Sequence, residues 1–173
     1  MKNKSALTFY TFLFVCFASL MYTGQVLGQE NDIFELTNDD ELSKVKVKKY
    51  KEDNRGKFYN LAQKLHTTSY ISNNTINKVY GEGEIKKITF EDSKSFSLLN
   101  NKIYNAVELI TVTLNNLSDL NNTLDLTTNK NLSSLKYVFV KCNFKCKKQQ
   151  IKKFVKAKSN SKIRIFYKTE SPS

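Results

Sequence analysis

The sequence has little of several residue types on which active sites depend. Its 173 residues include one histidine, one proline, five glycines and no tryptophan. A pair of zinc-binding histidines on one helix is therefore excluded, and neither a nucleophile elbow nor a phosphate-binding glycine loop is present. Residues 81–83, Gly-Glu-Gly, lack the further glycine and the helix of such a loop, so they predict a turn. We expect a protein that is not an enzyme and that uses no small-molecule cofactor.

The N-terminus has the pattern of a signal peptide. Lys2 and Lys4 provide a positive start, an apolar core runs over residues 7–21, and residues 26–28 are Val-Leu-Gly. The core is interrupted by polar side chains and is shorter than the ~20 residues that span a bilayer. We expect residues 1–28 to be removed, which leaves a protein that is secreted or located in the periplasm or at the cell surface. The abundance of Lys and Asn and the end of the signal resemble exported bacterial proteins.

The mature chain keeps two cysteines, Cys142 and Cys146. Export implies an oxidising compartment, and a turn or a helix start would bring their Cα atoms within the ~7 Å that a disulfide requires. The sequence leaves a disulfide and two buried thiols as alternatives. No metal site is expected, because there is no second cysteine pair and His66, the only histidine, is distant and predicted at a helix end on the surface.

Positive charge is concentrated in the last quarter of the chain. Without the two lysines of the signal, 28 − 2 = 26 basic and 16 acidic residues give a formal charge of +10. Residues 29–126 hold 13 basic and 15 acidic residues, whereas residues 130–168 hold 13 basic residues and no acidic one. Such a run is typical of a solvated helix face or of a surface that binds polyanions or anionic lipid head groups. Its central lysines are Lys145, Lys147, Lys148, Lys152, Lys153, Lys156 and Lys158. No nucleic-acid module signature accompanies the run, so no sequence-specific nucleic-acid binding is expected.

The mature chain divides into a leader and one domain. Residues 29–43 are acidic and sparsely apolar, which predicts a flexible leader. Within this leader, Ile33, Phe34 and Leu36 are expected to dock on the domain. Residues 44–173 form the single globular domain.

Two elements are predicted near the start of this domain. Residues 44–54 alternate apolar side chains with lysines, which indicates a short exposed strand. Residues 57–67 predict a helix, because four residues fall at helical spacing on one apolar face: Phe58, Leu61, Ala62 and Leu65.

From residue 85 onward one pattern recurs four times, in units that start near residues 85, 107, 135 and 160. Positions 4 and 6 of each unit are apolar and share one register: Ile88 and Phe90, Ile110 and Val112, Val138 and Val140, and Ile163 and Ile165. Each unit centres on a strand with a period of two, and the stretches between strands are long enough for a return segment. One of these, residues 146–158, has apolar residues at helical spacing. Strand, return segment and strand predict a parallel sheet.

The two middle units resemble the leucine-rich repeat signature L-x-x-L-x-L-x-x-N-x-L. The spacings of 22, 28 and 25 residues between unit starts fall within the family's range of roughly 20 to 29. One middle unit fills the signature with Val107, Ile110, Val112, Asn115 and Leu117. The other fills it with Leu135, Val138, Val140 and Asn143, but has Lys145 at the last apolar position. The outer units depart further, since Ser93 and Lys168 replace the asparagine and Asn160 replaces the first leucine.

The resemblance covers about residues 85–168. It implies an α/β fold with a short leucine-rich-repeat-like parallel sheet and helical return segments, in which the helix near residues 57–65 caps the N-terminal edge of the core. The alternative is an α+β domain with a mixed sheet.

The resemblance also implies a binding face, formed by the residues that alternate with the buried strand positions. The last two strands place aromatic and basic side chains there, suited to rings and anions. Together with lysines of the basic run, the candidate binding residues are Tyr137, Phe139, Lys141, Lys147, Lys148, Lys152, Lys153, Lys162 and Arg164. If helices cover this face, its aromatic residues are core instead.

These observations predict a secreted binding or scaffolding module whose strand face binds a protein partner. The alternative is a protein that binds a polyanion or an anionic envelope surface through its basic C-terminal region.

Overall fold

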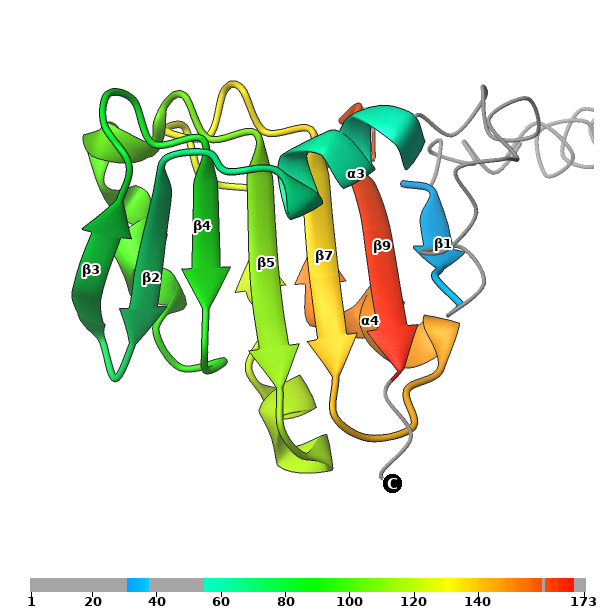
Figure 1. Ribbon diagram of the computed structural model, residues 1–173. Coiled ribbons are helices and arrows are strands. Elements are labelled where there is room, and N and C mark those ends of the chain that lie inside the picture. Colours follow the sequence, from blue (N-terminus) through cyan, green and yellow to red (C-terminus); the bar gives the residue numbers. More distant parts are fainter. Residues whose placement is uncertain (1–30, 38–54, 160, 170–173) are drawn as a thin grey trace, which may run out of the picture.

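The computed structural model describes residues 31–37, 55–159 and 161–169 (Figure 1). The predicted signal peptide, the predicted strand at residues 44–54 and Asn160 lie outside the described residues. Within the described residues, no helix is long and apolar enough to cross a membrane.

The described chain folds around a sheet of seven strands in the order β1-β9-β7-β5-β4-β2-β3. All neighbouring strands are parallel except β2 and β3, which form an antiparallel hairpin. The strands are β1 (Ile33–Glu35), β2 (Thr68–Ser72), β3 (Thr75–Tyr80), β4 (Lys87–Phe90), β5 (Leu109–Leu114), β7 (Tyr137–Cys142) and β9 (Arg164–Thr169). The predicted α/β class is confirmed. Strands β4, β5, β7 and β9 lie side by side in the order in which they follow one another along the chain.

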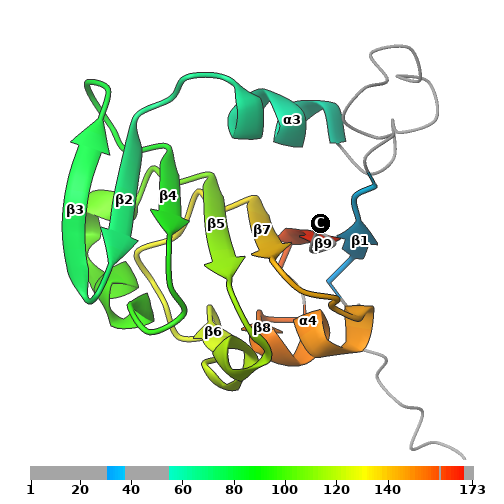
Figure 2. The same ribbon diagram turned by 60° about the horizontal axis from the view of Figure 1, so that its bottom comes forward.

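The return segments between the parallel strands cover one face of the sheet (Figure 2). They contain short 3-10 turns and the helix α4, and two of them pair through the two-residue strands β6 and β8. Their elements are η1 (Phe96–Asn100), η2 (Lys102–Tyr104), η3 (Leu117–Asn121), β6 (Leu124–Asp125), α4 (Lys148–Phe154) and β8 (Val155–Lys156). Helix α4 falls inside the return segment predicted at residues 146–158.

The main core lies between the sheet and these return segments. One row of paired residues crosses four parallel strands and is buried: Ile88, Ile110, Val138 and Ile165. Burial of each such side chain stabilises the fold by roughly 1.5–3 kcal/mol. Val138 therefore pairs with Ile165, not with Ile163, and the fourth unit begins two residues later than predicted. A shift of two residues leaves the same side chains on the same face, so apolar alternation alone cannot fix the register.

One residue of the repeat pattern does not enter the core. Leu117 occupies the last apolar position of the second unit, yet its side chain is 61% exposed. The chain turns at this point, because Asn116 caps η3 by accepting from Ser118 N while Asp119 accepts from Asn116 N. Leu117 is the first residue of this turn and lies on its solvent side.

The hairpin of β2 and β3 forms the edge of the sheet farthest from β1. Asn73 and Asn74 form its two-residue turn with φ values of 50° and 56°. Positive φ at both central positions defines the turn type whose twist matches paired strands, and asparagine tolerates it better than most residues. The repeat pattern begins only at residue 85 and predicts no strand here.

The acidic leader is part of the fold at residues 31–37. Ile33, Phe34 and Glu35 pair in parallel with Ile165, Phe166 and Tyr167. Ile33 and Leu36 are buried, as their predicted docking requires. This stretch is consequently an edge strand, not a flexible leader, and the folded domain includes residues before 44.

Helix α3 (Arg55–Gln63) lies on the other face of the sheet and crosses β5, β7 and β9 (Figures 1 and 2). The prediction that it caps the N-terminal edge of the core is wrong. Its Phe58 is fully buried and stacks on Phe166, with 4.3 Å between ring centroids, so aromatic side chains on β7 and β9 determine where the helix docks. The helix ends before Leu65, which was predicted on its apolar face and is fully exposed.

Candidate functional site

The aromatic residues of the predicted binding face are core residues. Tyr137 is 3% exposed and Phe139 is 7% exposed. The ring of Phe58 on α3 meets both rings edge to face, with centroid distances of 5.9 Å and 5.3 Å. We call this group the covered cluster: Leu36, Phe58, Leu109, Tyr137, Phe139 and Phe166. Tyr137 and Phe139 therefore cannot contact a partner while α3 is docked.

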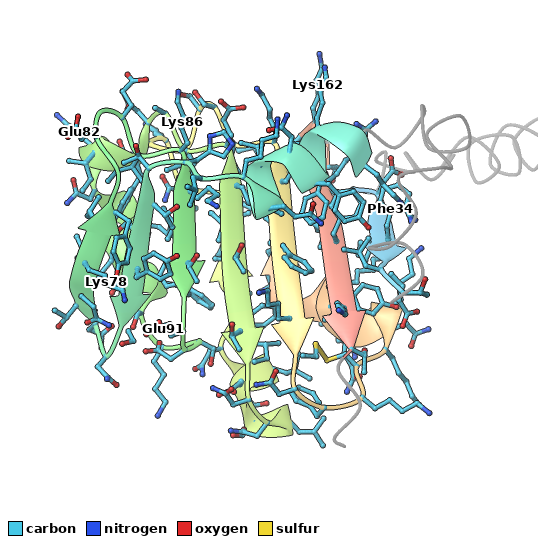
Figure 3. All side chains as sticks on the ribbon, viewed as in Figure 1. Phe34, Lys78, Glu82, Lys86, Glu91 and Lys162 are labelled. Atoms are coloured by element: carbon cyan, nitrogen blue, oxygen red, sulfur yellow. A yellow bond between two sulfur atoms is a disulfide. The ribbon has the colours of Figure 1, made fainter. Side chains whose placement is uncertain are left out.

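The basic residues that were predicted beside these aromatic residues lie at different positions on the sheet. Lys141 is exposed on the α3 side of β7, and Arg164 is half-buried at the start of β9. Lys162 is exposed in the segment before β9, at the edge of the sheet where the parallel strands begin (Figure 3).

The lysines of the basic run belong to a different surface. Lys147, Lys148, Lys152 and Lys153 are exposed at and on α4, whose Ile151 and Phe154 are buried in the main core. Because α4 and α3 lie on opposite faces of the sheet (Figure 2), these lysines and the strand-face residues do not form one site.

Cys142 and Cys146 form a disulfide, with 6.3 Å between their Cα atoms. This is the first of the two alternatives that the sequence left. Both cysteines are buried, and the bond closes the turn that follows β7. It therefore fixes the chain between the end of β7, next to Lys141, and the start of α4.

The strand face continues beyond the covered cluster. No helix or strand of the described chain lies over β2, β3 and β4 on this face (Figures 1 and 2). Strand alternation and pairing place one set of side chains there. We call this set the open patch: Tyr70, Lys78, Tyr80, Lys87, Thr89, Thr111, Thr113 and Lys141. Each of its members is exposed or half-buried.

Three lysines of the open patch are held by neighbouring groups. The Nζ atom of Lys78 lies over the rings of Tyr70 and Tyr80, 5.3 Å and 4.8 Å from their centroids. Lys87 Nζ donates to the carbonyl of Lys64 at 3.2 Å. Lys141 Nζ lies 5.6 Å from the centroid of Phe139. Cation–π contacts of this kind orient an ammonium group without neutralising its charge.

The pKa values of two of these lysines shift in opposite directions. Burial, together with the positive charge of Lys141, lowers the pKa of Lys87. The hydrogen bond and the charge interaction with Tyr80, helped by Glu91, raise the pKa of Lys78. Lys78 and Glu91 lie toward the same end of the patch in Figure 3. Glu91 therefore offsets part of the positive charge at Lys78, whereas Lys87 and Lys141 repel one another.

A groove adjoins the patch between the segment after α3 and the β3–β4 loop. Its volume is about 650 Å³, and it is lined by Leu65, His66, Thr67, Tyr80, Gly81, Glu82, Glu84 and Lys86. Gly81 has a φ of 89°, and a Cβ at this position would lie 3.0 Å from Thr67, so a glycine is required for the close approach. Because Lys86 pairs with Glu84, the carboxylate of Glu82 is what makes this groove different in charge from the open patch.

Tyr70, Lys78 and Tyr80 are not among the predicted binding residues, because they lie on a hairpin that was not predicted. Asn73-Asn74 between two apolar, β-branched stretches was the available signal. Within the described ranges, no group of three or more His, Cys, Asp or Glu side chains is arranged to hold a metal ion.

Comparison with protein-family models, with curated proteins and with solved structures found no match. The chemistry of the surface is therefore the basis for a functional assignment.

Proposed function

We propose that this chain is an exported binding module built as a short leucine-rich-repeat-like solenoid, and that it recognises its partner through the open patch. The solenoid architecture is supported by strands that are consecutive both in the sequence and in the sheet. Their return segments all lie on one face of the sheet. Equivalent asparagines of two units also stack, since Asn143 Nδ2 donates to Asn115 Oδ1 at 2.8 Å. Leucine-rich repeats commonly bind partners on the strand face that their return segments leave free.

The observation that carries the assignment is the division of the strand face. Helix α3 covers its apolar end, whereas the end on β2, β3 and β4 presents Lys, Thr and Tyr side chains. If the strand face served only for packing, it would be apolar where α3 covers it. The uncovered part would then have no reason to carry a set of oriented lysine side chains. The proposed role is binding and not catalysis.

A photo-crosslinking residue at Thr111 of the full chain tests this function. Thr111 is half-buried in the middle of the sheet, and Lys153 on α4 is the matched exposed control position. On the surface of the producing cell or in its secreted medium, we expect a crosslinked product from position 111 and not from 153. Products from 153 alone would contradict the use of the strand face.

A second candidate is polyanion binding through α4. It is favoured by the exposure of all seven lysines from Lys145 to Lys158. Reversal of charge at Lys147, Lys148, Lys152 and Lys153 would abolish such binding and its salt dependence, while recognition by the strand face would persist.

A further inference from the structure

We infer that the ligand of the open patch is an acidic polysaccharide, a hydroxyl-rich chain that carries carboxylate or sulfate groups. This inference rests on the proposed use of the strand face and specifies the chemistry of the partner. It depends on three features of the patch: oriented cations, a stripe of hydroxyl groups and the scarcity of features that protein partners use.

The cations are oriented before a ligand arrives. Lys78 is held by two tyrosine rings, Lys141 by a phenylalanine ring and Lys87 by a backbone carbonyl. A flexible lysine loses rotamer entropy when it binds, and an anchored one loses less. The three side chains come from β3, β4 and β7, so they span four strand spacings, or about 19 Å. One small anion cannot reach all three, whereas an extended polyanion can.

Like charges face one another on the strands at the β7 side of the patch. Lys141 stands directly opposite Lys168 on the neighbouring strand β9. Like charges in this position destabilise a sheet, and the interaction of Lys141 with Lys87 is also repulsive. An anionic group placed between Lys87 and Lys141 would reduce the repulsion between these two ammonium groups and would thereby favour binding.

Hydroxyl groups occupy the space between the cations. Thr89 and Thr111 are paired neighbours on β4 and β5, and Thr113 follows two residues along the same strand. All three are half-buried, and each hydroxyl is both a donor and an acceptor. The ring hydroxyls of a sugar have the same two capacities, so a polysaccharide lying across the strands would find a partner at each step.

A protein partner fits this composition less well. The centre of a protein interface is enriched in Trp, Tyr, Arg and Met, and hot spots contain few threonines. The centre of the open patch is formed by threonines and lysines, with its two tyrosines at the β3 end. A nucleic acid fits less well too, because single strands bind through free aromatic faces and Lys78 already lies over both tyrosine rings.

The groove beside the patch limits the direction in which the ligand lies. Glu82 lines it and would repel a polyanion, whereas the charge of Glu84 is paired with that of Lys86. We therefore place the polysaccharide from β3 toward β7 and the Lys141 end, away from the β3–β4 loop.

The test uses the protein as it is after natural removal of its export signal. It measures binding to alginate, heparin and a mixed-sequence single-stranded DNA over a salt series. The variant replaces Lys78, Lys87 and Lys141 with glutamine. The matched control replaces Lys148, Lys153 and Lys156, which are exposed on the other face, and removes the same charge. Thermal unfolding of each variant verifies the fold. We expect the Kd for alginate or heparin to rise about ten- to a hundredfold in the patch variant and at most about threefold in the control, since several surface ion pairs are lost together.

Thr111→Val is a second variant that removes one hydroxyl and keeps the size of the side chain. A weaker polysaccharide complex with unchanged thermal stability would support the inference, because a loss of charge cannot explain it. Equal losses in the patch variant and in the control would overturn the inference and favour the surface of α4. Patch-dependent binding of DNA with no binding of either polysaccharide would also overturn it.

The crosslinking at Thr111 separates this inference from the proposed function. A protein crosslinked at 111, without polysaccharide binding, would overturn the polysaccharide and leave the strand face as the binding site. No crosslink and no polysaccharide binding would overturn both.

Discussion

The two ends of one strand face differ in what covers them, although one continuous sheet forms both. Toward β7 and β9, the ring of Phe58 fills the space over Phe139 and Phe166, and the residues are core. Toward β3, Tyr80 is 55% exposed and Lys78 is exposed. The contrast shows that alternation along a strand defines which residues share a face, and that a distant helix determines which of them are buried.

The largest expected effect comes from Phe58→Ala, which removes this contrast. The substitution leaves a cavity among four aromatic side chains, and truncation of a buried phenylalanine costs about 3–5 kcal/mol of unfolding free energy. Chemical denaturation would measure the loss. Leu65→Ala is the matched control, since Leu65 is fully exposed just after the same helix, and should change stability by less than about 0.5 kcal/mol. A loss below about 1 kcal/mol for Phe58→Ala would contradict the docking of α3.

The sequence predicts one layer of this fold well and the other poorly. The apolar positions of β4, β5 and β7 repeat in one register, so their parallel pairing follows from local pattern. The α3 side depends on contacts between residues far apart in sequence, such as Phe58 with Phe166, and strand pattern contains no information about them. Tyr137 and Phe139 were therefore assigned to a binding face that the helix covers.

The edges of the sheet were missed for two further reasons. Strand β1 pairs with β9, at the other end of the chain, and its acidic surroundings indicated a leader. The β2–β3 turn is Asn-Asn, a weaker hairpin signal than Asn-Gly. The open patch depends on that hairpin, so its Tyr70, Lys78 and Tyr80 were not predicted.

Reduction of the disulfide should cause the next largest loss of stability, and this loss should be confined to the covered end. For a loop this short, the chain-entropy relation gives on the order of 2 kcal/mol. Hydrogen exchange after reduction should increase around Cys142 and Cys146 and remain unchanged in the β2–β3 hairpin. Faster exchange in both regions would show that the two ends unfold as one unit.

At the open end, Asp92 fixes a turn as the disulfide does at the covered end. Its carboxylate accepts from the backbone N–H groups of Asn73 at 2.6 Å, Lys94 at 2.8 Å and Ser95 at 3.0 Å, and from the Ser95 hydroxyl at 2.8 Å. These bonds fix the hairpin turn to the end of β4. Because the carboxylate is partly solvated, we expect Asp92→Asn to cost about 1 kcal/mol near neutral pH.

The pH dependence of this cost has a defined sign. Burial alone would raise the pKa of Asp92, but the hydrogen bonds from Asn73, Ser95 and Lys94 outweigh it and lower the pKa below its usual value. The stabilisation is therefore present above the unfolded pKa of about 3.9 and is lost as the pH falls through the lower folded value. Denaturation at a series of acidic pH values should show a shallower decline for Asp92→Asn. A parallel decline in both proteins would contradict the role of this carboxylate.

The smallest expected effect concerns the row of charges that joins the two ends. Glu108, before β5, bonds to Lys136 and lies 4.0 Å from Lys86, which in turn pairs with Glu84 at 3.2 Å. Lys86, Glu108 and Lys136 each precede a strand at equivalent positions, and the backbone N–H groups of Glu108 and Lys136 donate to the carbonyls of Lys86 and Glu108. The backbone ladder holds the register here, so the ion pairs add little: Glu108→Gln should cost about 0.5 kcal/mol at low salt and less at high salt, because surface pairs are screened. Lys94→Gln, at an exposed lysine at the open end, is the control for a general charge effect. A salt-independent loss above about 2 kcal/mol would show that this row, and not the backbone ladder, couples the covered end to the open one.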